Sequence, residues 1–184
     1  QSKMLGNAKV EAISLIQTSA SLFEYGYDER IKALITEHSG APAYTSAEAI
    51  GAAARALGTR KIALVSPYTD QVIGQAKNYF EADCALEVVA MEGFGATDAY
   101  AIGALDESHA VEAFERVDSP EIEALVVPGG NLPTMRHIAS WEARFEKPVI
   151  TINQVVLWSM MANLGVKDPI ADHGRLLAEV PDWA

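Results

Sequence analysis

Cysteine and basic residues are scarce in this sequence. A single cysteine, Cys84, excludes an internal disulfide and a cysteine-rich zinc site, and it predicts a reducing, cytoplasmic location. The chain has 14 Lys and Arg residues against 25 Asp and Glu, and its formal net charge of -11 argues against nucleic acid or an anionic membrane as the partner. No apolar run approaches the roughly 20 residues of a membrane-spanning helix, and we expect no signal segment. The composition therefore predicts a soluble globular protein.

The sequence does contain apolar runs that end in small polar residues. Glu11 to Ser21 (EAISLIQTSAS) begins like a buried strand and ends in hydroxyl and amide side chains. Ile122 to Thr134 (IEALVVPGGNLPT) repeats this design. Ligands bind at the carboxyl ends of strands in open parallel sheets. Two such strand ends predict one site between two similar halves.

Strands and helices are expected to alternate along the chain. The expected strands are residues 12–17, 42–44, 61–65, 86–91, 125–127 and 148–152. The expected helices are residues 27–38, 46–57, about 70–81, 107–117, 132–145 and 154–164. Asp28 and Asp70 are expected to cap helices, and Gly93 to Asp98 is too rich in glycine to continue a strand. The alternation predicts an α/β fold with parallel sheets and right-handed crossovers.

Five stretches of the chain carry a family resemblance. They are ISLIQTSAS, TSAEAIGAAARALGTRKIALVSPYTDQV, GFGATDAYAIG, ALVVPGGNLPTM and KPVITINQVVLW. In order and spacing they resemble the aspartate/glutamate racemase superfamily, and within it the branch of maleate cis-trans isomerases and arylmalonate decarboxylases. The resemblance implies two Rossmann-like halves related by a pseudo-twofold axis, with a small carboxylate or dicarboxylate in the cleft between them and no cofactor.

The same resemblance predicts how the chain divides between the two halves. We assign residues 1–57 plus 149–184 to the first half and residues 58–148 to the second. The first half is expected to be incomplete at its N-terminus, because the resemblance begins after the family's first strand and helix. A homodimer is compatible with the resemblance.

The chain departs from the family at the catalytic positions. The racemases and maleate isomerases carry a cysteine at each of the two strand ends, and arylmalonate decarboxylases keep the second, which protonates a carbanion. The matching positions here are Gln17 and Gly129, and neither side chain can act as a thiolate. Cys84 matches no catalytic position. The two-thiol racemisation is therefore excluded.

The residues that match the family's anion-binding positions are retained. Thr18 and Ser19 match a hydroxyl pair that holds a substrate carboxylate, and Tyr68 matches a tyrosine that helps to hold it. Gly130 would let the backbone approach a ligand closely, and Asn131 could donate to a ligand. Taken singly, the hydroxyl residues are more typical of helix caps and turns, but together they favour a carboxylate site.

The remaining candidates are weaker. No pair of histidines has the spacing of metal ligands, so no metal site is expected. Trp141, Trp158 and Trp183 are expected to pack as core or interface aromatics.

Three hypotheses follow for the function. The first is an enzyme that performs lyase-like or isomerase-like carbanion or enolate chemistry on a small carboxylic acid, with Tyr68, a water held by Gln17 or an upstream residue as the proton source. The second is a binding or sensory protein that has kept the anion site and lost the chemistry. The third is an engineered or incomplete form of an active parent.

Overall fold

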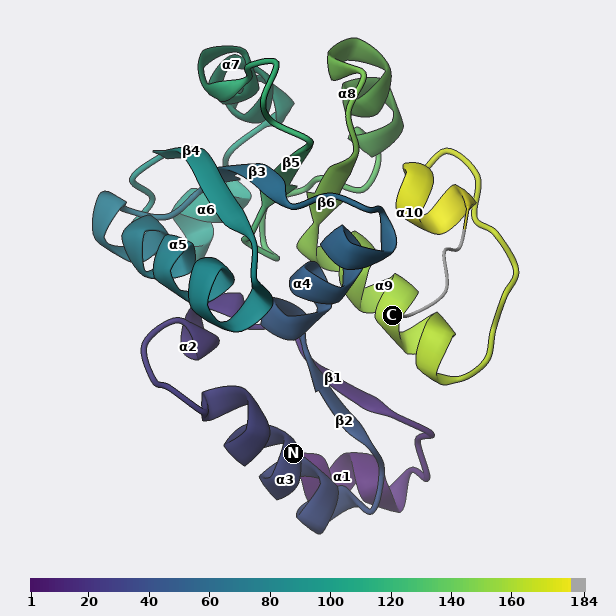
Figure 1. The fold of residues 1–184 in the computed structure, drawn as a ribbon. Coiled ribbons are helices and arrows are strands. Elements are labelled where there is room, and N and C mark those ends of the chain that lie inside the picture. The colour runs from purple at the N-terminus through teal and green to yellow at the C-terminus, as the bar shows by residue number, and fades with distance from the viewer. Residues whose placement is uncertain (180–184) are drawn as a thin grey trace.

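Two parallel sheets organise the computed structural model, which describes residues 1–179. The larger sheet has four strands in the order β4-β3-β5-β6, and the smaller sheet pairs β1 with β2. The strand bounds are β1 Ile13–Leu15, β2 Ala43–Thr45, β3 Lys61–Ser66, β4 Glu87–Gly93, β5 Ala124–Val127 and β6 Val149–Thr151. Figure 1 shows the small sheet beside α1 and α3, below the large sheet. The predicted α/β class with parallel sheets is confirmed.

Helices connect every pair of consecutive strands. Their bounds are α1 Ser2–Asn7, α2 Thr18–Ser21, α3 Tyr27–Ser39, α4 Ser46–Ala56, α5 Asp70–Cys84, α6 Ala99–Gly103, α7 Glu107–Val117, α8 Ile138–Phe145, α9 Ile152–Asn163 and α10 Arg175–Ala178. In α5 the buried residues Ile73, Ala76, Phe80 and Cys84 recur at helical spacing. They form the apolar stripe that holds the helix against the sheet.

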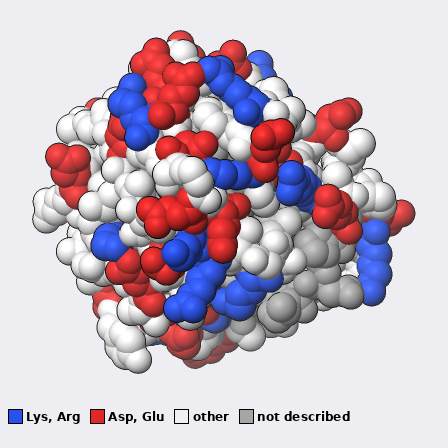
Figure 2. Space-filling model, turned by 45° about the horizontal axis from the view of Figure 1, so that its top comes forward, with Lys and Arg blue, Asp and Glu red and all other residues white. Residues whose placement is uncertain are grey.

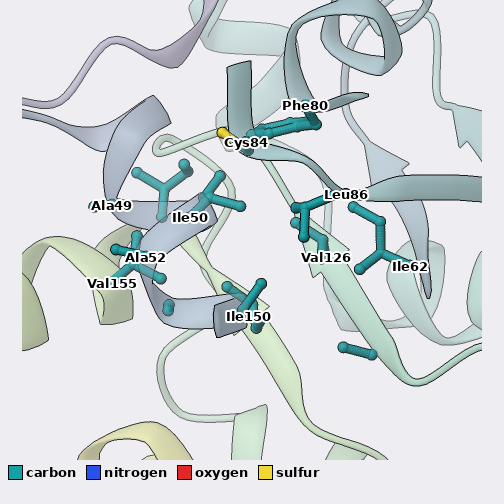
Figure 3. Close-up of a cluster of buried hydrophobic side chains, with 14 of the residues drawn as sticks. Ala49, Ile50, Ala52, Ile62, Phe80, Cys84, Leu86, Val126, Ile150 and Val155 are labelled. Carbon is teal, nitrogen blue, oxygen red and sulfur yellow. The ribbon is translucent and has the colours of Figure 1, made fainter. Parts of the chain in front are cut away.

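The large sheet is buried on both faces. One cluster of apolar side chains lies between the sheet and helices α4, α5 and α9, as Figure 3 shows around Ile62, Val126 and Ile150. A second cluster lies on the other face, where α7 supplies Phe114 and α8 supplies Trp141. Burial on both faces explains why β5 is apolar at each position, as expected for a central parallel strand.

Helices α4 and α9 begin in the same way and pack against each other. Thr45 precedes α4, and its hydroxyl donates to Glu48 Oε2 at 3.2 Å. Thr151 precedes α9, and its N–H donates to Gln154 Oε1 at 3.3 Å. Each helix therefore starts with Thr followed three residues later by Glu or Gln, the spacing of a capping box. Each also follows the second strand of a parallel pair, β1–β2 or β5–β6, so the same arrangement of strand pair and helix occurs in both sheets.

Several local expectations are corrected by the structure. Gly26, not Asp28, precedes the first turn of α3, and the Asp28 carboxylate is buried. Thr69 rather than Asp70 is the N-cap of α5, which continues past Glu81 to Cys84. Residues 132–137 are not helical, because Pro133 cannot continue a helix and α8 starts only at Ile138. The short helices α6 and α10 were not expected, and Trp183 lies outside the described residues.

The boundary between the halves depends on where β6 belongs. The predicted division assigns residues from 149 onward to the first half. In the structure, β6 pairs with β5 over Leu125 to Val127, so it completes the large sheet. Helix α4, which the division also assigns to the first half, covers a face of that sheet. The exact division stays a prediction.

Candidate functional site

The first wall of the candidate site follows β1. Gln17 is exposed and forms the N-cap of α2. The Thr18 side chain is buried, and its hydroxyl lies 3.0 Å from the Ser46 hydroxyl at the start of α4. Within residues 1–179, the backbone N–H groups of Thr18 and Ser19 donate to no other protein atom. This wall therefore offers free backbone donors and the half-buried Ser19 hydroxyl.

The second wall is the turn after β3. The Ser66 hydroxyl donates to the Pro128 carbonyl at 2.9 Å, and the Tyr68 N–H donates to Ser66 Oγ at 3.3 Å. These bonds fix the turn against the end of β5. The Ser19 side chain lies close enough to Tyr68 to oppose part of the rise in the pKa of Tyr68, so the two walls meet at these side chains. Burial raises the pKa of Tyr68 to about 12, which keeps its hydroxyl a donor at neutral pH.

The third wall is the turn after β5. Gly129 has φ +141°, and a Cβ on it would lie 2.7 Å from Pro67 Cδ. A Cβ on Gly130 would lie only 3.1 Å from Ile16 Cγ2. The carboxyl ends of β1 and β5 are therefore in contact, as expected from the paired strand ends. Asn153, at the start of α9, donates from Nδ2 to the Gly130 carbonyl at 3.1 Å and holds this turn.

Asn131 contacts α6. Its Nδ2 donates to the Ala99 carbonyl at 2.5 Å, which attaches α6 to the turn after β5. The glycine-rich loop beyond β4 is held nearby, because the Gly95 N–H donates to the Tyr68 carbonyl at 3.0 Å. Asn131 thus fixes the rim of the site in this structure.

The structure brings Ser19 close to Tyr68 and Gly130 close to Ile16, with Gln17 and Gly129 at the same strand ends. Hydroxyl and backbone N–H donors dominate this region. Such an arrangement can bind the oxygens of a carboxylate and stabilise negative charge that develops beside it.

Cys84 differs from the site residues in its environment and in its expected reactivity. It is the last residue of α5 and is 5% exposed in the first core cluster. A Cβ on Gly51 would lie 2.6 Å from its Sγ, so α4 packs directly on the thiol. Burial raises the pKa of Cys84 to about 12, although Arg55 opposes this effect. These properties are those of a packing residue and not of a nucleophile.

A separate cavity of about 690 Å³ lies behind α2. Residues of α3, β2, α4 and α5 line it, together with the loop that follows α2. Ser21 contributes to its wall, but Ser19, Tyr68 and Gly130 do not. The site at the strand ends is thus defined by its donors, and not by this cavity.

Two residues near the site were not assigned a role from the sequence. The contact of Ser46 with Thr18 depends on the packing of α4 against α2. The bond of Asn153 to Gly130 depends on the position of α9 beside β5. The one sequence signal for Asn153 is an amide immediately after an apolar strand.

Other features of the described residues complete the description of the surface. Figure 2 shows acidic and basic side chains interspersed on one face. Across residues 1–179, no three His, Cys, Asp or Glu side chains converge as metal ligands would. In the same range, every helix is too short or too polar to cross a membrane.

Comparison with known proteins gives consistent results. The sequence model of a family described as arylmalonate decarboxylase matches residues 1–177. A maleate isomerase from Geobacillus stearothermophilus is 26% identical over 159 residues, which are 83% of this chain and 63% of the relative. An arylmalonate decarboxylase from Bordetella bronchiseptica is 28% identical over 174 residues, 91% of this chain and 71% of the relative. The chain thus spans less than two thirds of the length of that maleate isomerase.

Solved structures share the fold. A maleate cis-trans isomerase from Nocardia farcinica, with a covalently bound succinylcysteine intermediate, superposes with a TM-score of 0.91 at 23% identity. The alignment covers 97% of this chain and 75% of that one. An arylmalonate decarboxylase variant in a liganded form gives a TM-score of 0.87 at 24% identity, covering 97% of this chain and 77% of the other. The predicted fold is confirmed.

Proposed function

We propose that this chain, which belongs to the arylmalonate decarboxylase family by the match over residues 1–177, is an isomerase or lyase that acts on a small carboxylic or dicarboxylic acid. The proposed chemistry passes through a carbanion or enolate, without a cofactor and without the cysteine pair. The names of the relatives support this reaction class, since they are maleate isomerases and an arylmalonate decarboxylase.

The proximity of the Ser19 and Tyr68 side chains is the observation that carries the proposal. Ser19 follows β1 of the small sheet, and Tyr68 follows β3 of the large sheet. Gly130 lies against Ile16, three residues before Ser19, and its N–H donates to no protein atom within residues 1–179. A carboxylate placed there would accept charge-assisted bonds from both hydroxyls and from backbone N–H groups. Thr18 would contribute through its N–H, since its hydroxyl faces Ser46.

The same donors support the proposed reaction step. Loss of carbon dioxide from the acid breaks a C–C bond and leaves its electron pair as an enolate, and fixed donors stabilise the negative charge on the enolate oxygen. A proton then returns to carbon. The candidates for its source are Tyr68, which stays protonated at neutral pH, and a water held by the exposed Gln17.

A second candidate function is a binding protein for a small acid that no longer catalyses a reaction. The backbone at Gly129 favours it, because φ of +141° and the 2.7 Å approach to Pro67 leave no room for a cysteine side chain. In this second function, the hydroxyls of Ser19 and Tyr68 and the backbone of Gly130 bind the carboxylate, and no proton transfer follows.

Binding of malonate and maleate, measured by isothermal titration calorimetry, tests the site shared by both functions. Ser19→Ala and Tyr68→Phe should each weaken binding by about ten-fold to over a hundred-fold, because a hydrogen bond to a charged group contributes roughly 1.5 to 3 kcal/mol. The free energy of unfolding should fall by no more than about 1 to 2 kcal/mol. Tyr25→Phe is the matched control, since Tyr25 is 95% exposed.

Turnover separates the two functions. Wild type and Tyr68→Phe would be incubated with maleate and with phenylmalonate, and fumarate and carbon dioxide would be measured. Turnover that Tyr68→Phe reduces supports the enzyme, and tight binding without turnover supports the binding protein. Unchanged affinity in both variants, with a large loss of stability, would reject the carboxylate site.

A further inference from the structure

Asp28 is a buried carboxylate that joins three helices. It lies in the first turn of α3 and is 5% exposed. Its Oδ1 accepts from the Ser21 hydroxyl at 2.7 Å, and its Oδ2 accepts from the Tyr79 hydroxyl at 2.7 Å. Ser21 ends α2 and Tyr79 lies on α5. The carboxylate therefore connects α2, which belongs to the small-sheet side, with α5, which covers the large sheet.

The two hydroxyl residues of the candidate site are also close in sequence to helices α2 and α5. Ser19 is the second residue of α2, and α5 begins two residues after Tyr68. These helices are thus joined twice by side chains. One connection is the contact between the Ser19 and Tyr68 side chains within the site. The other is the Ser21–Asp28–Tyr79 network behind it.

Ligand binding affects these two connections differently. Ser19 and Tyr68 each have one hydroxyl proton to donate, so a carboxylate that accepts both protons replaces any hydrogen bond between the two side chains. The network at Asp28 contains neither residue and is unaffected by that exchange. It would then be the side-chain hydrogen-bond connection that still fixes α2 relative to α5.

We propose that Asp28 is a positioning residue that holds the Ser19 side of the carboxylate site at its distance from the Tyr68 side. This inference rests on the proposed function, because it assigns the network to the same site. In this role Asp28 acts neither as a cap of α3 nor as an acid or base. Positioning by a buried network favours binding, since the donors are already arranged before the ligand arrives.

The chemistry of the network suits this role. Burial and the adjacent Asp28 carboxylate raise the pKa of Tyr79, so the phenol remains protonated and continues to donate. Hydrogen bonds to a charged acceptor are shorter and stronger than neutral ones, and low local dielectric strengthens them further. The network should therefore persist across the neutral pH range.

Tyr79→Phe and Ser21→Ala test the proposal, because each removes one donor and leaves the carboxylate in place. The matched control is Tyr27→Phe, next to Asp28 on the same helix, since no hydrogen bond of the Tyr27 hydroxyl is seen within residues 1–179. Two quantities are measured well below the melting temperature. They are the affinity for malonate and the rates of amide hydrogen exchange at residues 18–22.

Tyr79→Phe and Ser21→Ala should each weaken malonate binding about two- to ten-fold and accelerate exchange at residues 18–22, while Tyr27→Phe changes neither. A lower melting temperature with unchanged affinity and exchange would overturn the proposal, because a purely structural residue behaves in that way. If wild type binds neither malonate nor maleate but exchange still accelerates in both variants, the tie between α2 and α5 is supported and the proposed function fails.

Discussion

Tyr68 is a residue whose raised pKa makes a testable contribution to stability. Its pKa is raised from 10.0 to about 12, so the folded state favours the protonated phenol. The resulting contribution to the free energy of unfolding is fully present below pH 10 and is lost as the pH rises through 12. The free energy of unfolding should therefore fall more steeply between pH 10 and 12 in wild type than in Tyr68→Phe. Denaturant titrations of both proteins at several pH values measure this difference in pH dependence.

Tyr79 provides the internal background for that comparison. Its pKa is also raised by burial and it is present in both proteins, so its titration cancels in the difference. Parallel pH profiles for wild type and Tyr68→Phe would contradict the assigned burial of the Tyr68 hydroxyl.

Cys84 should be unreactive and dispensable for the proposed site. Because burial raises its pKa from 9.0 to about 12, its thiolate fraction at neutral pH should be about a thousand-fold lower than that of a free thiol. Iodoacetamide should modify it slowly in native protein and quickly in denaturant, as followed by mass spectrometry. Malonate affinity should be unchanged in Cys84→Ala.

Rapid native modification together with loss of binding would show that the thiol belongs to the site. Cys84→Ser serves as a second variant, because it keeps the volume but buries a hydroxyl at a cost of about 1 to 3 kcal/mol.

Site residues and buried connections differ in how well they could be predicted. Ser19 and Tyr68 were identified by their resemblance to a family pattern, and strand-end chemistry supported them. Asp28 was assigned to a helix cap, because an acidic residue near a helix start is typical of one. Its actual partner Tyr79 is 51 positions away along the chain, and no local pattern reports such a contact.

The turn after β5 is the element whose backbone should tolerate substitution least. Gly129→Ala should destabilise the protein by about 2 to 4 kcal/mol, because φ of +141° is unfavourable for alanine and Cβ would overlap Pro67. Gly130→Ala is the matched comparison, with its nearest contact at 3.1 Å to Ile16 Cγ2. Gly130→Ala should lower the free energy of unfolding by less than Gly129→Ala does. Urea denaturation of both variants measures the order, and equal losses would contradict this account.

Elements were predictable to the extent that their own sequence determines them. The apolar runs of β3 and β5 identified buried strands, because both faces of the large sheet are covered. Helix α10 could not be found in this way. It is positioned by tertiary contacts, since Glu142 Oε2 accepts from the Arg175 N–H at 2.8 Å and Gln154 Nε2 donates to the His173 carbonyl at 2.8 Å.

At the scale of the whole molecule, the core crosses the predicted boundary between the halves. Ile50 of α4, Ile150 of β6 and Trp158 of α9 are fully buried in one cluster with β3 and β5. A fragment of residues 58–148 lacks all three elements and should not unfold cooperatively, because its sheet would expose an apolar face. A fragment of residues 41–163 retains these elements and should unfold cooperatively. Circular dichroism during thermal unfolding distinguishes the two.

Cooperative unfolding of the shorter fragment would support the predicted division. The sequence indicates that Val149 to Thr151 is a strand, but packing decides which strand is its neighbour in the sheet.

Strand β1 uses only one of its two edges. It pairs with β2, and within residues 1–179 no strand lies along its other side, whereas β5 is flanked by both β3 and β6. Ile16, directly beyond β1, is 51% exposed. An unused row of peptide groups beside an apolar side chain is a template on which another polypeptide can lengthen the sheet. A polypeptide segment that supplies one more strand would therefore extend the small sheet along β1.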